Sequence, residues 1–479
     1  MSAKINRLLV KVSGAPAGHI TTRRTGDGGT RYSFTYLPDA GPEQALSVTM
    51  PVRDESYATW QMPPALEMSL PEGALKAHLE NRFARIVSMD PMGLLFVTGK
   101  ARIGNITAEL PADNKDPELA ELGKLLAQHQ QQQDAIDSDE ITRVSDSELE
   151  SLFERLLDRY AISSGVGGVQ PKVLGRTMVR SSGNPDKMAL RTPGHIVKTS
   201  DDDLPFLCLN EHLCLKVAMR SGLDVPRRVL SDNGEVLILE RFDIKPGGHY
   251  QVEDGCVLLG KPAKDRYEGS MERLVGALLT SIPDDRRRAA SWSLFTQVVI
   301  NTLVRNGDAH LKNFAILYDS PGNARLTKVF DITTTAAYDL FGKDLQAITL
   351  NGTRNWPSQK DLIRLGRDRC KLEERECREI MEKVITAVTA IGKTIPNEIV
   401  KYSGSEHILG AMLQQWNGAI KSLRTGKPKE VAAIKTELDE TEQALLASYG
   451  DPYLNQKDRK DRLRKTREPQ RTVMYAPQR

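Results

Sequence analysis

The sequence predicts an α+β protein with two lobes, in which the N-terminal part contains a β-rich subdomain and the C-terminal lobe is mostly helical. Short segments with strand-like alternation fill the region before about residue 110. Strand and helix patterns then alternate over residues 161–350, and helical patterns dominate from Asp361 until about Ser448. A chain of 479 residues is too long for one hydrophobic core, so we expect two or three domains.

The first subdomain is expected to span residues 1–127. Residues 7–12 and 31–36 are predicted strands, and the second of them alternates apolar and polar side chains with period 2. A predicted helix near residues 75–83 precedes an apolar run at residues 93–97, which we predict to be another strand. This subdomain shows little catalytic chemistry.

Two polar segments separate or follow the predicted domains. Residues 128–145 are a predicted linker, because the run QHQQQQDAIDSDE lacks the apolar side chains needed to bury a core. A helical pattern follows at residues 146–160. The tail at residues 455–479 carries nine Lys and Arg against three Asp and Glu, and we expect it to be disordered.

Composition excludes several classes of protein. The hydrophobic content of 39% and the charged content of 27% are those of an ordinary globular protein. Five cysteines without a C-x-x-C pair argue against a zinc site or a disulfide framework and favour a reducing compartment. No stretch approaches the roughly 18 apolar residues of a membrane span, and nothing resembles a signal-peptide cleavage site. We therefore expect a cytoplasmic protein without membrane association.

The most informative segment is VRNGDAHLKN at residues 304–313. Phosphoryl transfer needs a carboxylate that receives the hydroxyl proton, oxygen ligands for Mg²⁺ and a cation on the phosphates. Asp308 and Asn313 have the spacing of the catalytic loop of protein kinases, in which the Asp orients the nucleophile and the Asn holds metal. His310 and Lys312 lie between them and could stabilise the loop or the developing charge.

A predicted hairpin after this segment leads to a second carboxylate. Residues 314–318 and 326–330 are predicted strands around a turn, and the second strand delivers Asp331 as a further metal ligand. The alternative is that residues 306–308 are only a turn and Asp331 a solvated strand end. The order helix, loop, strand, turn, strand, Asp favours the catalytic interpretation.

Upstream segments supply the remaining parts of a nucleotide site in the expected order. The glycine-rich run SSGVGGVQPK at residues 163–172 could bring backbone N–H groups close to phosphate oxygens, although most such runs are flexible turns. A short predicted strand ends in Lys198, and Glu211 lies in the first turn of the next predicted helix, residues 207–221. Glu211 could pair with Lys198 or merely complement the helix dipole. Residues 236–243 form a buried strand that runs into a turn, as a kinase hinge does.

Together these motifs resemble the HipA family of bacterial toxin kinases. The resemblance covers nearly the whole chain except the basic tail, and it is carried by five segments: 168–172 (GVQPK), 210–214 (NEHLC), 240–243 (ERFD), 306–313 and 330–331. It implies a two-lobed, protein-kinase-like fold with a nucleotide-binding lobe core at residues 146–250 and a helical C-terminal lobe at residues 251–454.

The resemblance also implies roles for individual residues, with ATP and Mg²⁺ as cofactors. Asp308 would be the catalytic base, with His310 and Lys312 beside it, and Asn313 and Asp331 would bind Mg²⁺. The residues expected to bind the nucleotide are Gly165, Val166, Gly167, Gly168, Val169, Gln170, Lys172, Lys198, Glu211, Glu240, Arg241 and Phe242.

Family membership further implies partners. Members phosphorylate a serine of an aminoacyl-tRNA synthetase, and they pair with a small helix-turn-helix antitoxin that binds operator DNA and uses the toxin as co-repressor. A protein substrate, an antitoxin and indirect DNA contact are therefore expected here, and the serine/threonine kinase would be a toxin.

One departure from the family concerns autophosphorylation. A loop serine that switches members off would fall at Gly165 in this sequence, and its neighbours Ser163 and Ser164 are the candidate replacements. A phosphate there would add nearly two negative charges beside the ATP phosphates. Alternatively, neither serine is modified and regulation comes only from a partner.

Two other functions remain open from the sequence. Asp-x-His-x-x-Asn also occurs in small-molecule kinases, whose acceptor would need an enclosed acidic pocket rather than an open cleft. The second alternative is a non-catalytic, partner-bound transcriptional regulator, whose basic tail could contact phosphates non-specifically. The presence of Asp308, Asn313 and Asp331 together argues against the regulator.

Overall fold

The structure is a computed structural model that describes residues 2–99, 103–131, 188–191, 194–200, 203–339 and 345–425. The described residues all belong to one compact unit, Met1–Ile434. Most of the predicted linker, the predicted helix at 146–160, the glycine-rich run and the basic tail lie outside the described residues. Within the part of the chain that is described, no helix is long and apolar enough to cross a membrane.

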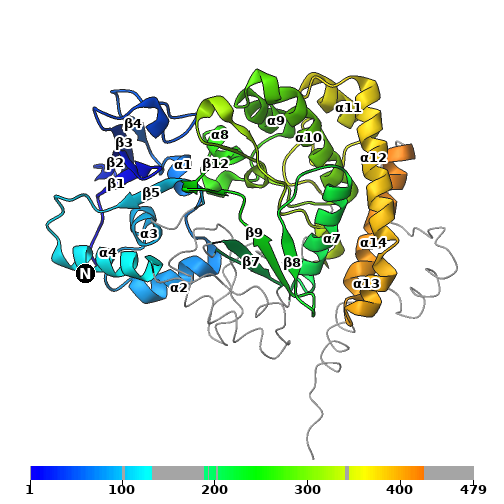
Figure 1. Cartoon of the computed structure of the whole chain (residues 1–479), viewed down its shortest axis with the longest axis horizontal. Helices are drawn as coiled ribbons and strands as arrows, with labels where there is room; N and C mark the ends of the chain where they lie inside the picture. The colour runs from blue at the N-terminus through cyan, green and yellow to red at the C-terminus, as the bar shows by residue number, and fades with distance from the viewer. Residues whose placement is uncertain are drawn as a thin grey trace, which may run out of the picture. The chain divides into compact units, whose positions relative to one another are not determined.

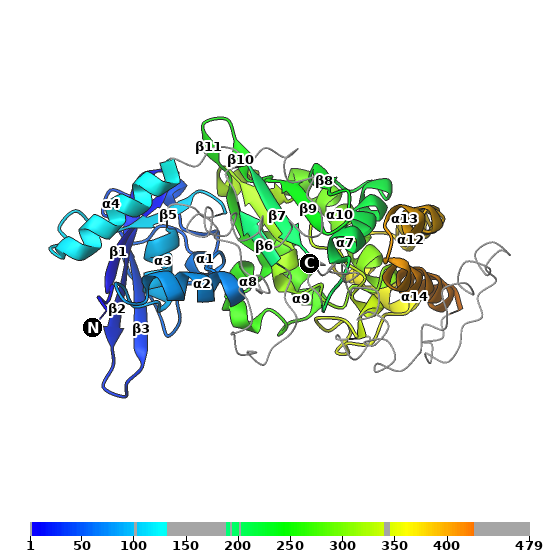
Figure 2. The same cartoon turned by 90° about the horizontal axis from the view of Figure 1, so that it is seen from below.

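The N-terminal region is built on an antiparallel five-stranded sheet in the order β4-β3-β2-β1-β5 (Figure 1). Leu8 and Val10 alternate toward the core and are fully buried, as the strand period requires. Figure 2 shows α1, α2 and α3 on one side of this sheet. The elements are β1 (Arg7–Val12), β2 (Ala15–Arg24), β3 (Thr30–Tyr36), β4 (Tyr57–Thr59), α1 (Pro64–Glu67), α2 (Gly73–Phe83), α3 (Pro91–Thr98), β5 (Ile106–Glu109) and α4 (Pro117–Gln131).

Most sequence predictions for this region are confirmed, and one is wrong. The strands at residues 7–12 and 31–36 and the helix near 75–83 are present, whereas the predicted strand at 93–97 lies inside helix α3. Asp90 caps α3 by accepting hydrogen bonds from the N–H groups of Met92 and Gly93, each at 3.0 Å. The helix is buried on all sides, so its apolar run has no periodicity that distinguishes helix from strand. Helix α4 continues to Gln131, into the segment predicted as linker.

The region predicted as the nucleotide-binding lobe core contains a four-stranded antiparallel sheet in the order β6-β7-β9-β8. Its strands are β6 (Met188–Arg191), β7 (His195–Thr199), β8 (Arg228–Leu230) and β9 (Val236–Glu240), and helix α7 (Leu207–Arg220) packs against them. The helix ends at Arg220, and Gly222 follows with a φ of +89°, the left-handed conformation typical of a residue just past a helix.

The larger lobe is mostly helical. A small antiparallel sheet in the order β12-β13-β14 lies beside the helices, and its strands are β12 (Gln251–Asp254), β13 (Ala315–Tyr318) and β14 (Arg325–Leu326). Helices α7, α10 and α12 pack against one another in both views (Figures 1 and 2). The helices of this lobe are α8 (Gly255–Leu258), α9 (Met271–Thr280), α10 (Asp284–Leu303), α11 (Gln359–Asp368), α12 (Glu374–Gly392), α13 (Ile395–Lys401) and α14 (Glu406–Thr425).

Strand β14 is shorter than the predicted strand at residues 326–330. The N–H of Thr327 still donates to the carbonyl of Ala315 in β13 at 3.0 Å, but the N–H of Val329 donates to the carbonyl of Asp224 at 2.8 Å, so the chain has left the sheet by that residue. Cys370 and Cys377 are buried and have free thiols.

Candidate active site

The catalytic loop predicted at residues 304–313 follows helix α10 and ends in one turn of 3₁₀ helix, Leu311–Asn313. The carboxamide of Asn306 organises it, donating to Asn301 Oδ1 at 3.0 Å and accepting the N–H of Asp308 at 3.2 Å. Gly307 is required here, because a Cβ at this position would lie 2.7 Å from the carbonyl oxygen of Leu345. The loop is therefore a fixed structure rather than a simple turn.

Asp308 and Asn313 are held together within this loop. The side-chain amide of Asn313 donates to the backbone carbonyl of Asp308 at 2.9 Å. That bond uses the NH₂ group and leaves the amide oxygen of Asn313 as the atom suited to a hard metal ion. The carboxylate of Asp308 accepts a hydrogen bond from the hydroxyl of Tyr267 at 2.7 Å.

Asp331 lies at the end of the segment that follows β14, in a left-handed backbone conformation with φ of +59°. This conformation is uncommon outside glycine, although Asp and Asn tolerate it better than most residues. The N–H of Asp331 donates to Glu211 Oε1 at 3.2 Å, and its carbonyl lies 3.5 Å from the amide nitrogen of Asn306. These contacts connect Asp331 to both helix α7 and the catalytic loop.

Lys198 joins the two lobes through its ammonium group. Its Nζ lies 2.7 Å from Glu211 Oε1, 2.9 Å from Glu211 Oε2 and 2.9 Å from Asp331 Oδ1. The pairing of Lys198 with Glu211, one of two alternatives left by the sequence, is thus present. Burial lowers the pKa of Lys198, but the carboxylates of Asp331 and Glu211 outweigh that effect and raise it above its usual value.

This triad is almost entirely enclosed. The exposed fraction of the side chain is 10% for Lys198, 1% for Glu211 and 20% for Asp331. Burying a carboxylate without a positively charged partner costs free energy. The ammonium of Lys198 offsets that cost for both Glu211 and Asp331, and the two carboxylates in turn hold the ammonium beside Asp331. Carboxylate and amide oxygens are the ligands that Mg²⁺ prefers, so the side chains of Asp331 and Asn313 are of the chemical type that fits that metal.

His310 and Lys312 are both ordered by contacts within the protein. The ring of His310 is buried against Tyr267 in an edge-to-face arrangement with centroids 5.1 Å apart, and burial lowers its pKa. The ammonium of Lys312 donates to the carbonyl of Met68 at 2.7 Å and lies 3.5 Å from Asp254 Oδ2. Lys312 thus ties the catalytic loop to the N-terminal region.

Of the predicted hinge residues, Glu240 is the last residue of strand β9, and Arg241 and Phe242 follow it. The guanidinium of Arg241 is paired with Asp243 at 2.5 and 2.9 Å, with side-chain exposures of 1% and 3%. The side chain of Arg241 is therefore engaged in this ion pair. The backbone N–H of Arg241 donates to the carbonyl of Gly194 at 3.0 Å. Phe242 packs against Phe330 with ring centroids 5.6 Å apart, next to Asp331.

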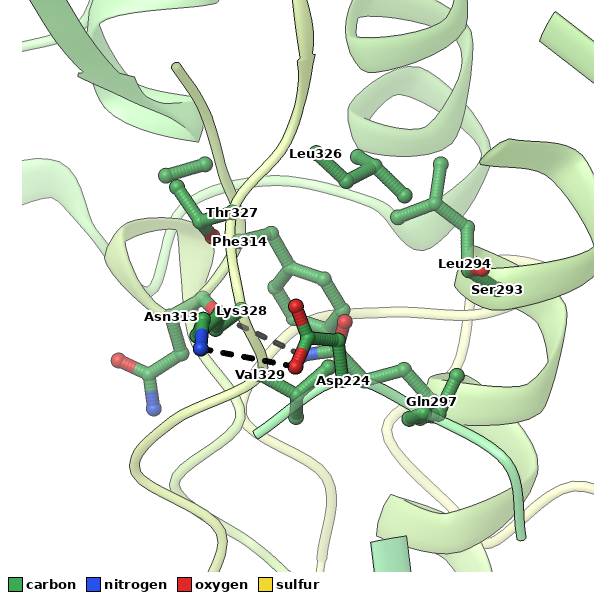
Figure 3. Close-up of a pocket in the computed structure, with 12 residues that line it drawn as sticks. Asp224, Ser293, Leu294, Gln297, Asn313, Phe314, Leu326, Thr327, Lys328 and Val329 are labelled. Carbon is green, nitrogen blue, oxygen red and sulfur yellow. Dashed lines mark hydrogen bonds and ion pairs between the residues drawn. The ribbon is translucent and has the colours of Figure 1, made fainter. Parts of the chain in front are cut away.

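A cavity of about 130 Å³ lies on another side of the catalytic loop. Phe314, Leu294 and Leu326 line it, and Lys328 lies 3.7 Å from Asp224 at its edge (Figure 3). Figure 3 shows Asn313 at one side of the cavity. Lys198, Asp308 and Asp331 are not among its lining residues, so it is separate from the triad.

Several predicted residues lie outside the described part of the chain. They are Ser163, Ser164, Gly165, Val166, Gly167, Gly168, Val169, Gln170 and Lys172. Conversely, sequence reasoning missed Tyr267, the partner of Asp308. Its position, 41 residues before Asp308, gives no local signal, and only the fold brings the two side chains together.

Comparison with known proteins identifies a family that this chain matches over most of its length. A family model described as "HipA-like C-terminal domain" matches residues 164–391, and a model described as "HipA N-terminal domain" matches residues 8–109, which together are more than half of the chain. Two proteins of Sinorhizobium fredii (strain NBRC 101917 / NGR234) that are provisionally named kinases are similar to it. Y4dM is 24% identical over 423 residues, which are 82% of this chain and 94% of that protein. Y4mE is 29% identical over 345 residues, which are 68% of this chain and 76% of that protein.

Among solved structures, a chain in the complex of HipA, HipB and operator DNA from Shewanella oneidensis MR-1 has a similar fold. The match has a TM-score of 0.60 at 18% identity and covers 88% of this chain and 100% of that chain. The predicted two-lobed, kinase-like α+β fold is therefore confirmed.

Proposed function

Because this chain belongs to the HipA family, we propose that it is an ATP- and Mg²⁺-dependent serine/threonine protein kinase that acts as the toxin of a toxin–antitoxin system. The observation that carries the proposal is the buried triad in which the ammonium of Lys198 contacts both Glu211 and Asp331. A phosphate-binding lysine, its helix glutamate and a metal-binding aspartate are the parts that a kinase must bring together.

In this proposal each side chain has a separate task. The oxygen of the acceptor hydroxyl attacks the γ-phosphorus of ATP, the bond from that phosphorus to the bridging oxygen breaks, and ADP leaves. Asp308 orients the hydroxyl and receives its proton. Lys198 binds the phosphate oxygens. Asn313 and Asp331 would hold Mg²⁺, which when bound neutralises charge on the phosphates.

His310 and Lys312 have supporting tasks. His310 is buried beside Tyr267, where it packs the loop, and Lys312 anchors the loop to Met68 and Asp254. Glu240, Arg241 and Phe242 form the proposed adenine-binding hinge, in which the Arg241–Asp243 pair holds the backbone. The glycine-rich run at residues 163–172 is proposed to cover the phosphates.

The proposed partners follow the same family. We infer that the substrate is a protein of the translation machinery, such as an aminoacyl-tRNA synthetase, and that an antitoxin links the chain to operator DNA. The similar Shewanella chain comes from a complex with HipB and operator DNA, which supports an antitoxin partner. Autophosphorylation is proposed at Ser163 or Ser164. Phosphopeptide mapping after prolonged incubation with Mg-ATP tests it, and unmodified peptides would exclude it.

The test of the kinase proposal is Mg-ATP-dependent phosphate transfer by the purified chain to proteins of a cell lysate, with the products identified by mass spectrometry. Transfer should be abolished in Asp308→Ala and Asp331→Ala. The matched control is Asp368→Ala, which removes a surface carboxylate that is 62% exposed and should transfer normally. A wild-type chain that neither binds Mg-ATP nor transfers phosphate would contradict the proposal and favour a partner-bound regulator.

A further inference from the structure

A short segment at residues 263–267 lies against the catalytic loop. The N–H of Leu311 donates to the carbonyl of Arg266 at 3.1 Å, which fixes the backbones to each other. The next residue, Tyr267, donates its hydroxyl to Asp308 Oδ1 at 2.7 Å, and its ring packs edge-to-face on His310. Backbone, hydroxyl and ring contacts thus define where the Asp308 carboxylate sits.

The same segment is held from the other side by the N-terminal region. Glu67, the last residue of α1, accepts the N–H of Ala263 at 3.0 Å, and Glu72 forms an ion pair with Arg266. The side chains of Arg266 and Glu72 are 18% and 26% exposed, so this ion pair is partly shielded from solvent. Helix α1 lies beside α8 in Figures 1 and 2.

The stretch that supplies these contacts also reaches the loop directly. The carbonyl of Met68, one residue after α1, accepts the ammonium of Lys312 at 2.7 Å. Residues 67–72 therefore touch the segment that carries Tyr267 at two points and the catalytic loop at a third. The N-terminal region therefore supports the catalytic loop in addition to forming its own sheet.

The hydrogen bond from Tyr267 has a chemical consequence. A carboxylate can accept at two oxygens, and the tyrosine hydroxyl occupies Oδ1. Without the tyrosine hydroxyl the carboxylate could rotate about its χ2 torsion, which is broad for Asp, and spend less time in the productive orientation.

We propose that Tyr267 is a positioning residue for Asp308, and that residues 67–72 of the N-terminal region hold it in place through the Glu72–Arg266 ion pair. The inference rests on the proposed kinase function and deepens it, because it assigns the N-terminal region a part in phosphoryl transfer.

The test uses the full chain and compares Tyr267→Phe with Tyr57→Phe. Both changes delete one tyrosine hydroxyl with a hydrogen bond of 2.7 Å, but the hydroxyl of Tyr57 donates to the carbonyl of Pro51, away from the catalytic loop. We expect Tyr267→Phe to lower kcat by about 10- to 100-fold, the range typical of a misplaced catalytic group. KM for ATP, Mg-ATP affinity by calorimetry and Tm should stay near the wild-type values, and Tyr57→Phe should leave kcat unchanged.

A charge exchange tests the second half of the proposal. Glu72→Arg and Arg266→Glu should each lower kcat, and the double variant should restore it, because the ion pair is rebuilt in reverse. The proposed role of residues 67–72 would be overturned if neither single variant lowered kcat. It would also be overturned if the kcat of the double variant were as low as that of the slower single variant.

The outcomes separate this inference from the kinase proposal. If the wild-type chain transfers phosphate and Tyr267→Phe is as fast, only the positioning role is overturned. A Tyr267→Phe chain that is slow because it binds Mg-ATP poorly and has a lower Tm also contradicts positioning, since the hydroxyl would then be structural. If the wild-type chain transfers no more phosphate than Asp308→Ala does, both the kinase proposal and this inference are overturned.

Discussion

We expect Glu253, a buried carboxylate outside the active site, to make the stability of this protein depend on pH. Glu253 on strand β12 is fully buried and accepts hydrogen bonds from Ser47 Oγ at 2.8 Å and Val48 N–H at 2.9 Å, and also from the hydroxyl of Tyr318. Burial raises the pKa of Glu253 from 4.5 to about 7, even though the three donors lower it. The folded protein therefore holds this proton more tightly than the unfolded chain does.

The direction of the pH effect follows from that difference. Below pH 4.5 both states are protonated at Glu253, whereas above it the unfolded chain ionises and the folded protein does not. The free energy of unfolding should consequently fall as the pH rises from 4.5 to about 7, by about 3 kcal/mol in total. Roughly 2 kcal/mol of this change falls between pH 5 and 7.5.

Glu253→Gln removes the titration while keeping an acceptor oxygen and adding an NH₂ donor that can reach the Tyr318 oxygen. Its free energy of unfolding relative to wild type should rise by about 2 kcal/mol between pH 5 and 7.5. Urea unfolding followed by tryptophan fluorescence measures this at both pH values. Glu379→Gln, at a side chain that is 64% exposed, is the matched control and should follow wild type. A Glu253→Gln advantage that is the same at both pH values would refute the reasoning.

Four further outcomes are expected. Lys198→Met should abolish phosphate transfer and lower the free energy of unfolding by about 3–5 kcal/mol, because Glu211 and Asp331 lose their shared cation; a variant as stable as wild type in urea would contradict the buried triad. Arg241→Met should destabilise the chain by a similar amount, about 3–5 kcal/mol, because the buried carboxylate of Asp243 loses its guanidinium partner, and thermal unfolding beside Arg227→Met, whose side chain is 89% exposed, provides the comparison. Asp90→Ala should cost about 1 kcal/mol in urea unfolding through the lost cap of α3, and no change would mean that the cap is dispensable. Removing Mg²⁺ with EDTA should stop transfer and excess Mg²⁺ should restore it, whereas transfer that persists in EDTA would argue against a metal site.

Local patterns predicted the elements in which apolar side chains recur with a clear period. Strand β1 and helix α7 were expected within a residue or two of their observed bounds, since each shows a clear period of apolar side chains. Helix α3 was mistaken for a strand because burial on all sides erases that period. The prediction for β14 failed for a different reason, namely a backbone hydrogen bond from Val329 to the distant Asp224.

The residues of the candidate site also fall into those that the sequence could indicate and those that only the tertiary structure brings together. The spacing of Asp308 and Asn313 and the order of Lys198 and Glu211 are local features, so the sequence could indicate them. Tyr267 and the lysine–aspartate contact between residues 198 and 331 depend on tertiary structure, with partners 41 and 133 positions apart. No spacing rule reaches across such distances.

The contacts between the N-terminal region and the core also determine when, during translation, the N-terminal region can complete its packing. Ser47 donates a hydrogen bond to Glu253, which lies 206 positions later in the chain. Glu67 accepts one from Ala263, 196 positions later, and the carbonyl of Met68 accepts one from Lys312, 244 positions later. At about 5–20 residues per second, a ribosome needs roughly 10–40 s to make the 206 residues that separate the first pair. The surface of the nascent N-terminal region that makes these contacts must therefore stay uncovered for that time, and the catalytic loop can contact Met68 only after residue 312 has been made.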